Sequence, residues 1–168
     1  MRPRPGFVEL SLKAERVMLR TRTLSAILLI PLVIVVVWLG GVVLLITIAL
    51  VGLLAWYELV HLWQASGHRP SLWLGSALVV WFVIVIALLG TTSDGLRFAL
   101  VASLLFSLTF YLYRQQTASA SDWAVTFAGA AYLGLLLGHF PLLRESPAGL
   151  SWLAVAILAT WCNDTGAY

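Results

Sequence analysis

Residues 24–63, LSAILLIPLVIVVVWLGGVVLLITIALVGLLAWYELVHLW, decide the class of fold, because these 40 residues contain a single charged side chain, Glu58. A bilayer has a hydrocarbon core of about 30 Å, which a helix rising about 1.5 Å per residue crosses with about 20 apolar residues. The stretch is therefore long enough for two crossings and too long for one. Gly40 and Gly41 near its middle predict a tight hairpin between the two helices.

Four further apolar runs follow, separated by polar or helix-breaking residues. The runs are residues 72–90, 96–113, 123–143 and 150 to at least 160. The whole chain is 61% hydrophobic and 10% charged, with a mean hydropathy of +0.98, whereas a soluble domain is about 25% charged. Long unbroken apolar runs also exclude a membrane β-barrel, whose strands alternate apolar and polar residues. The sequence predicts an all-α, polytopic membrane protein with about six transmembrane helices.

The polar composition excludes some other classes. A formal net charge of +3 is too small to indicate nucleic-acid binding. The chain has one cysteine, Cys162, which excludes an internal disulfide and a cysteine-based zinc cluster. The function therefore has to be sought among the few polar residues of the helices.

The basic residues predict the orientation in the membrane, because Lys and Arg concentrate in short loops on the cytoplasmic side. With six helices, eight basic residues fall on the side of the amino terminus and two on the other. The eight are the six before residue 23, Arg69 and Arg114, and the two are Arg97 and Arg144. We expect a cytoplasmic segment over residues 1–23, a membrane domain over residues 24–168 in the cell inner membrane, and Tyr168 at the cytoplasmic face.

Glu58 and His61 lie one helical step apart near the predicted cytoplasmic end of the second helix. One interpretation places Glu58 in a polar cavity, because a charge deep in lipid costs several kcal/mol and is usually functional. The other places Trp56, Tyr57 and Trp63 in an aromatic belt at headgroup level, with Glu58 reaching water. The sequence leaves both interpretations open.

Two other sets of residues are assigned to structure. Ala130, Gly134 and Gly138 recur every four residues in the fifth apolar run, which predicts a face that another helix approaches closely. Asp94 and Asp122 stand at helix starts, where a carboxylate accepts hydrogen bonds from unpaired N–H groups. Neither set requires a role in chemistry.

The end of the chain is different, because the sixth apolar run continues directly into Asn163, Asp164 and Thr165 with no loop between. Amide, carboxylate and hydroxyl oxygens are the ligands that Mg²⁺ takes, and such a cluster also suits phosphate. A plain helix end with a capping aspartate is the alternative. Spacing alone does not separate the two.

The residues Asp164-Thr165-Gly166-Ala167-Tyr168 resemble the Asp-x-x-Ala-Tyr element of the phosphatidate cytidylyltransferases, also called CDP-diacylglycerol synthases. Residues 18–24 and 28–32 resemble the amino terminus of that family, and residues 126–134 resemble its Gly-x-x-Tyr span. The resemblance covers about residues 18–168.

This resemblance implies an enzyme that joins CTP to phosphatidic acid, releases pyrophosphate and forms CDP-diacylglycerol for phospholipid synthesis, with Mg²⁺ as cofactor. It implies that Asp164 is catalytic and a metal ligand, and that Asn163, Thr165 and Tyr168 bind substrate. The implied partners are CTP, phosphatidic acid and the lipid bilayer, and a homodimer is one assembly open to it. Displacement at a nucleotide α-phosphorus requires positioning and charge neutralisation, which agrees with oxygen ligands at the cytosolic face.

The chain departs from the family at its end. Family members continue through a Gly-Arg segment, a Ser-Pro-Lys-Lys-Thr loop and a signature with most of the metal and phosphate ligands, whereas this sequence ends at Tyr168 and has one lysine, Lys13. We therefore expect an amino-terminal part of a longer enzyme, inactive by itself. The alternatives are a transporter or channel subunit that coordinates ions with Glu58 and Asp164, and a structural membrane protein. The DNA after the Tyr168 codon distinguishes them.

Overall fold

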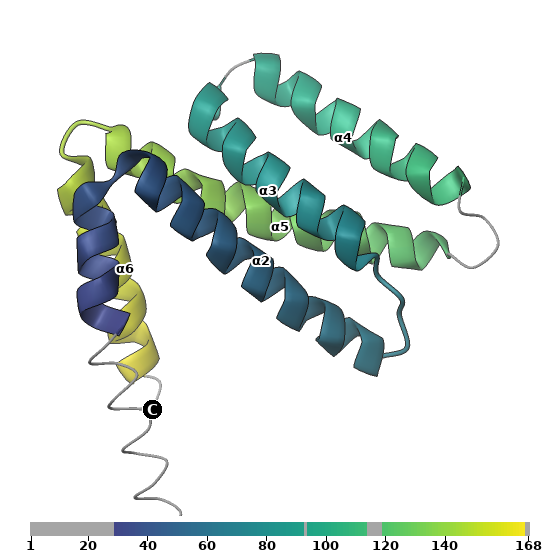
Figure 1. Cartoon of the computed structure of the whole chain (residues 1–168), viewed down its shortest axis with the longest axis horizontal. Helices are drawn as coiled ribbons and strands as arrows, with labels where there is room; N and C mark the ends of the chain where they lie inside the picture. Colours follow the sequence, from purple (N-terminus) through teal and green to yellow (C-terminus); the bar gives the residue numbers. More distant parts are fainter. Residues whose placement is uncertain (1–28, 93, 114–118, 167–168) are drawn as a thin grey trace, which may run out of the picture. The chain divides into compact units, whose positions relative to one another are not determined.

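The computed structural model describes residues 29–92, 94–113 and 119–166, and helix is the only regular secondary structure in these ranges. The chain divides into two compact units, Met1–Trp38 and Leu39–Tyr168. The described part of the first unit belongs to the apolar helix Leu29–Leu39, and the predicted basic segment 1–23 lies outside the described residues. The second unit contains α2 (Gly41–Ala65), α3 (Leu72–Leu89), α4 (Asp94–Tyr113), α5 (Ala120–Glu145) and α6 (Gly149–Gly166) (Figure 1).

The helices follow the predicted apolar runs wherever the structure describes them. Gly40, with φ +62°, separates the helix Leu29–Leu39 from α2, and Gly90, with φ +69°, ends α3. Glycine adopts a positive φ without steric cost. Four helices, α2 to α5, are long and apolar enough to cross a membrane. The all-α membrane fold is therefore confirmed, while the count of six spans and the hairpin at Gly40 stay predictions.

Helix α5 lies at the centre of the second unit and contacts each of the four other helices there. The predicted small-residue face consists of Ala130, Gly134 and Gly138, all of them buried. A Cβ atom added at Gly134 would lie 2.7 Å from Phe82 Cβ and 2.8 Å from the Val79 carbonyl oxygen of α3, and one added at Gly138 would lie 2.7 Å from Ile86 Cβ. The face therefore seats α3 against α5 at close range, as the spacing of the small residues predicts.

Trp56 of α2 is fully buried among the helices, so the interpretation that places it in an aromatic belt does not hold for this residue. Its ring lies directly over Gly75, where any side chain would overlap it, whereas a side chain at Gly129 would overlap the ring of Trp63. The indole N–H donates to the Leu72 carbonyl oxygen at 3.0 Å, which satisfies the polar atom. Tyr57, the next residue, is exposed, so two neighbouring aromatic residues face opposite environments.

Helix α4 is attached to its neighbours by indole hydrogen bonds. Trp81 of α3 donates to Ser103 Oγ at 2.9 Å, and Trp123 of α5 donates to Ser107 Oγ at 3.1 Å. The two serines are four residues apart and so share one face of α4. Between α3 and α4 lies an apolar hollow of about 340 Å³, lined by Leu74, Ala77, Leu78, Trp81, Ala102, Ser103 and Phe106.

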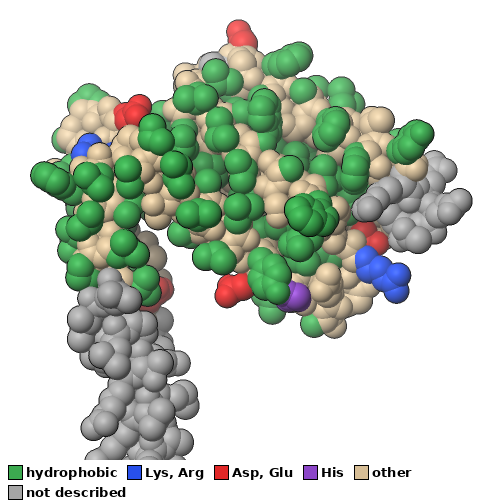
Figure 2. Space-filling model, in the orientation of Figure 1, with side chains coloured by type: hydrophobic (Ala, Val, Ile, Leu, Met, Phe, Trp, Pro, Cys, Tyr) green, Lys and Arg blue, Asp and Glu red, His purple; other side chains and the backbone are tan. Residues whose placement is uncertain are grey.

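Apolar side chains cover most of the visible face of the second unit, and charged side chains are few (Figure 2). Many large hydrophobic residues of α2, α4 and α6 are exposed, among them Leu54, Phe98 and Trp152. A surface of this kind is compatible with lipid and not with water.

Candidate functional site

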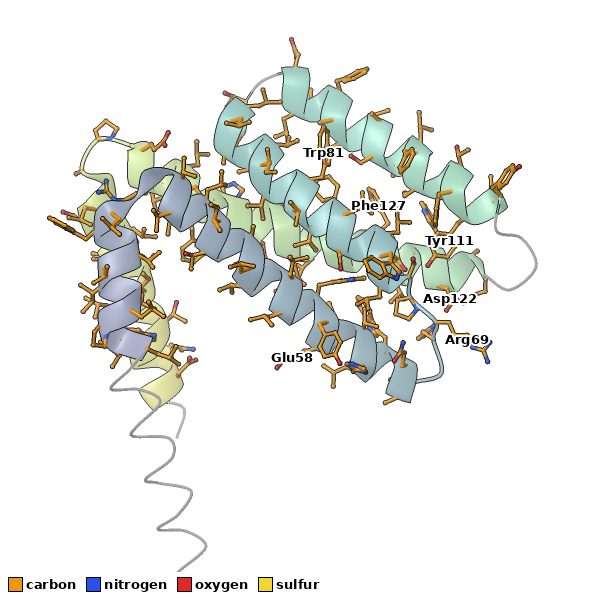
Figure 3. The ribbon with its side chains drawn as sticks, in the orientation of Figure 1. Glu58, Arg69, Trp81, Tyr111, Asp122 and Phe127 are labelled. Carbon is orange, nitrogen blue, oxygen red and sulfur yellow. The ribbon has the colours of Figure 1, made fainter. Side chains whose placement is uncertain are left out.

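One group of polar residues of the second unit lies where the α2–α3 loop, residues 66–71, meets the start of α5. Asp122 lies at the centre of this end (Figure 3), and its side chain is only 9% exposed. Asp122 Oδ1 accepts a hydrogen bond from the backbone N–H of Arg69 at 2.6 Å and lies 3.8 Å from Nδ1 of His68. The carboxylate therefore connects two segments that are 53 residues apart in the chain.

Asp122 also caps α5, as its position at the helix start predicts. Its backbone N–H donates to Ser119 Oγ at 3.2 Å, and its Oδ2 accepts from the Ser119 N–H at 3.3 Å. This reciprocal pair is a capping box, and it uses the carboxylate oxygen that Arg69 leaves free. Both carboxylate oxygens thus have partners within the protein.

A hydrogen-bond network of Ser71, Tyr111 and Thr126 lies one helical turn further into the bundle. The backbone N–H of Ser71 donates to Thr126 Oγ1 at 3.0 Å and to the Tyr111 hydroxyl at 3.1 Å. The two hydroxyl oxygens are 2.8 Å apart, and Thr126 donates to the Asp122 carbonyl oxygen at 2.7 Å. Ser71 belongs to the α2–α3 loop, Tyr111 to α4 and Thr126 to α5. The network therefore holds these three elements together at one end of the unit.

Sequence reasoning missed this arrangement apart from the cap. The pattern Ser119-x-x-Asp122 is typical of a capping box and was a signal for the cap. Nothing in the sequence indicates that Tyr111 and Thr126 share a partner, because a threonine hydroxyl commonly bonds a carbonyl of its own helix and the reach of a tyrosine hydroxyl depends on how the helices pack. The meeting of the loop with α5 follows only from the packing of α2, α3 and α5.

The predicted catalytic group lies elsewhere, in the last turn of α6. The helix continues through Gly166, so the polar residues extend the apolar helix without a loop, as the sequence indicates. Asn163 and Asp164 are exposed. The side chain of Thr165 and the whole of Tyr168 lie outside the described residues. Their predicted roles in substrate binding and catalysis therefore stay predictions.

Glu58 is exposed on α2, and its side chain points away from the helices around it (Figure 3). One turn of the helix further on, the ring of His61 packs edge-on against Tyr57, with ring centroids 4.4 Å apart. The predicted polar cavity around Glu58 stays a prediction. Asp94 occupies the first turn of α4, and its Oδ1 pairs with Arg97 Nη1 at 3.1 Å on the surface.

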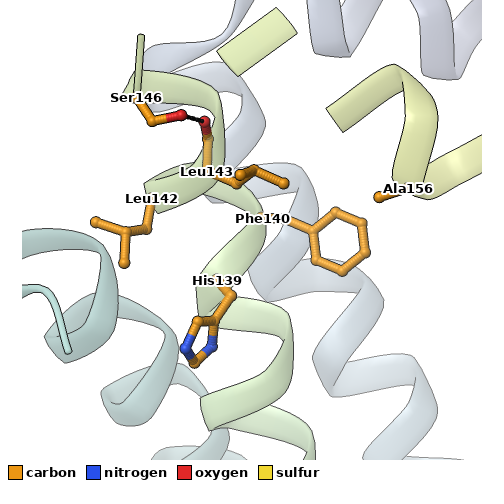
Figure 4. Close-up of a pocket in the computed structure, with 6 residues that line it drawn as sticks. All are labelled: His139, Phe140, Leu142, Leu143, Ser146 and Ala156. Carbon is orange, nitrogen blue, oxygen red and sulfur yellow. Dashed lines mark hydrogen bonds between the residues drawn. The ribbon is translucent and has the colours of Figure 1, made fainter. Parts of the chain in front are cut away.

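The opposite end of α5 carries an apolar hollow of about 400 Å³ (Figure 4). It is lined by His139, Phe140, Leu142, Leu143, Ser146 and Ala156. The polar groups there are already bonded to the backbone: Ser146 Oγ donates to the Leu143 carbonyl oxygen at 2.7 Å, and His139 Nδ1 lies 2.6 Å from that of Leu135. The rest of the lining is apolar, so this hollow shows no set of polar groups that points to chemistry.

The donor set tests whether the implied Mg²⁺ suits this chain. Within the described ranges no three His, Cys, Asp or Glu side chains lie close enough to hold a metal ion. Mg²⁺ often binds through one or two carboxylates, with water and substrate phosphates completing its ligands. The exposed carboxylate of Asp164 fits that mode of binding. Successive residues of a helix diverge by about 100°, so Asn163 presents its amide to a different direction.

These features define a multi-pass α-helical membrane protein with one structural polar end and one exposed polar helix end. Residues 20–168 match the model of the Cytidylyltransferase family, and the chain belongs to that family. It is 25% identical over 152 residues to a phosphatidate cytidylyltransferase of Staphylococcus haemolyticus, an alignment that covers 89% of this chain and 57% of that protein. The chain thus spans just over half the length of this curated relative. No solved structure matches the chain.

Proposed function

We propose that this protein is a phosphatidate cytidylyltransferase. The observation that carries the proposal is the family match over residues 20–168, which includes the terminal motif that begins at Asp164. The name of the Staphylococcus haemolyticus relative supports the same substrates, CTP and phosphatidic acid. Exposed apolar helices support a site beside the membrane, where a lipid substrate is available. The transporter alternative has no comparable support.

In the proposed reaction a phosphate oxygen of phosphatidic acid attacks the α-phosphorus of CTP. The new phosphorus–oxygen bond forms as the bond between the α-phosphorus and the bridging oxygen of the β-phosphate breaks, and pyrophosphate leaves. No covalent enzyme intermediate is needed, so the protein acts by positioning and by stabilising charge.

The roles proposed for this chain centre on the end of α6. Asp164 would hold Mg²⁺, which when bound neutralises charge on the CTP phosphates. Asn163, Thr165 and Tyr168 would supply neutral hydrogen bonds to the substrates. The exposure of Asn163 and Asp164 supports these roles, because neither side chain is enclosed by the bundle.

The test is formation of CDP-diacylglycerol from labelled CTP and phosphatidic acid in membranes of cells that express the gene through its own stop codon. We expect product that depends on both substrates and on Mg²⁺, with release of one pyrophosphate for each CTP consumed. Absence of CTP-dependent product in membranes that contain the folded protein would contradict the proposed function.

The proposal includes a cytoplasmic amino terminus in the inner membrane, because CTP is a cytosolic substrate. The distribution of basic residues supports it: the loop that contains Arg69 and the start of α5 lie at one end of the second unit, and Arg97 and Arg144 lie near the other. Single cysteines introduced at Arg69 and Arg97, with Cys162 replaced by Ser, test the orientation by labelling. We expect the cysteine at position 69 to react only after the membrane is made permeable.

A further inference from the structure

We propose that the α2–α3 loop, residues 66–71, is a preformed binding site for a phosphate group, with the Arg69 guanidinium as its principal ligand. The site is separate from the end of α6 and does not rest on the function proposed for Asp164. Its ligand is a phosphate at the membrane surface, carried either by a lipid headgroup or by a molecule in solution.

The loop is fixed before any ligand arrives, because each of its backbone N–H groups has a partner. Three of them close the end of α2: Ser66 and His68 donate to the Trp63 carbonyl oxygen, and Gly67 donates to that of Gln64, at 3.0–3.1 Å. The remaining two donate to side chains of α4 and α5: Arg69 N–H bonds Asp122, and Ser71 N–H bonds the hydroxyls of Tyr111 and Thr126. A loop tied in this way loses little conformational entropy when it binds a ligand.

The hydrogen bond from the Arg69 backbone to Asp122 leaves the charged side chain of Arg69 available. The two carboxylate oxygens of Asp122 accept hydrogen bonds from the backbone N–H groups of Arg69 and Ser119. Asp122 therefore fixes the backbone of Arg69 without pairing with its guanidinium. The side chain of Arg69 extends away from the helices (Figure 3), is exposed, and forms no hydrogen bond or ion pair with any residue that the structure describes. His68, which is 39% exposed, adds positive charge when it is protonated.

There is room for such a ligand beside Arg69. An open hollow of about 530 Å³, with polar and apolar walls, is lined by Gln64, Gly67, His68, Arg69 and Pro70. Gly67 has no Cβ atom and contributes open space there. The side chains offer a guanidinium, an amide and an imidazole, all of them hydrogen-bond donors, with no carboxylate among the lining residues.

Phosphate is the anion that the position of this loop favours, because the guanidinium itself pairs with carboxylates as well as with phosphates. The planar guanidinium of arginine donates two parallel hydrogen bonds to phosphate oxygens, which gives it an advantage over a simple point charge. The loop joins two helices that are long and apolar enough to span a membrane, so it lies at the depth where lipid phosphates are found.

The experiment measures binding to the purified 168-residue chain in dodecyl maltoside micelles. One arm titrates ³²P-labelled dioleoyl phosphatidic acid within the micelles, and the other titrates ³²P-labelled inorganic phosphate in solution. Oleate in the micelles serves as an anionic lipid without phosphate. We expect saturable binding in one arm, which oleate at equal charge does not displace, and at least a 10-fold weaker affinity after Arg69→Gln.

Matched variants separate a phosphate site from general attraction. Arg97→Gln removes an exposed arginine from the other end of the unit and should leave binding unchanged. Arg69→Lys keeps the charge but lacks the planar guanidinium that donates two parallel hydrogen bonds, so it should bind with intermediate affinity. Both Arg69 variants retain the backbone N–H that Asp122 accepts, so circular dichroism should show the helical content of the unaltered chain.

Each outcome decides the proposal. Binding of phosphatidic acid that requires Arg69 supports a lipid headgroup as the ligand, and binding of inorganic phosphate that requires Arg69 supports a soluble phosphate. No saturable binding in either arm, displacement by oleate, or equal binding by Arg69→Gln would overturn the site. Because the readout is binding, its failure is distinguishable from a failure of CDP-diacylglycerol formation.

Discussion

Two aspartates near helix ends, Asp122 and Asp164, show how one residue type serves different purposes. Asp122 at the start of α5 is buried, and both of its carboxylate oxygens accept hydrogen bonds from the protein. Asp164 at the end of α6 is exposed and belongs to the terminal motif. A carboxylate whose oxygens are already occupied stabilises the fold, whereas an exposed one can receive a ligand. The difference lies in the neighbouring backbone and not in the aspartate itself.

The largest expected effect concerns Asp164. Asp164→Asn keeps the shape and removes the charge, so an electrostatic role predicts a loss of activity of about 10²-fold or more, equal to about 2.7 kcal/mol of transition-state stabilisation. The measurement is CTP-dependent formation of CDP-diacylglycerol, with thermal unfolding as a control that should not change. Asn caps a helix about as well as Asp. Near-normal turnover would therefore assign Asp164 to structure, as for Asp122.

Gly134 tests the close packing of α3 on α5, which is structural like the hydrogen bonds of Asp122. Gly134→Leu should lower the free energy of unfolding by about 1–3 kcal/mol, because the new side chain meets the Val79 backbone of α3 at 2.8 Å and backbone cannot rotate away. Denaturant titration in micelles gives the value. Ala128→Leu is the matched control, since Ala128 is exposed on the same helix and should tolerate the change. Equal stability of the two variants would contradict close packing of α3 on α5.

Asp122 itself should affect stability and leave the chemistry of Asp164 alone. Asp122→Ala leaves the N–H groups of Arg69 and Ser119 without their acceptor, which should cost about 1–2 kcal/mol of unfolding free energy. Asp94→Ala is the control, because Asp94 is exposed at the start of α4 and pairs with Arg97 on the surface. We expect no measurable change in that variant. A larger loss in Asp94→Ala would mean that burial is not what distinguishes the two aspartates.

The smallest expected effect is at the contact between α3 and α4. Ser103→Ala removes the acceptor for the indole N–H of Trp81 and should cost about 0.6 kcal/mol, the average for a hydrogen bond between membrane helices. Thr109→Ala is the control, because Thr109 is exposed and its Oγ1 bonds the Leu105 carbonyl of its own helix. Denaturant titration in micelles gives the two free energies of unfolding. Equal losses in the two variants would contradict the contact.

Much of the fold follows from the sequence, because the signals are local. Apolar runs of about 20 residues predict membrane helices wherever they occur, since lipid leaves the backbone no partner outside its own helix. Helices α2 to α5 lie where those runs lie, and glycine interrupts them at residues 40 and 90. The spacing of the small residues on α5 also predicts the face that α3 contacts.

Aromatic and polar side chains were harder to place. Trp56 and Tyr57 are adjacent and similar in character, yet one is fully buried over Gly75 and the other is exposed. An indole is common both at a membrane interface and in a core, so its place depends on whether another helix provides room for the ring. The sequence contains Gly75 but does not say which ring it receives.

The sequence by itself determined the class of protein, the helices, the small-residue face of α5, the cap at Asp122 and the family motif at Asp164. The tertiary structure alone decided that the backbone N–H groups of Arg69 and Ser71 bond to residues 53 and 55 positions further along the chain. The reason is physical: hydrophobic length, helix spacing and capping depend on neighbours within a few residues. Hydrogen bonds between distant segments form only when packing brings their donors and acceptors within about 3 Å.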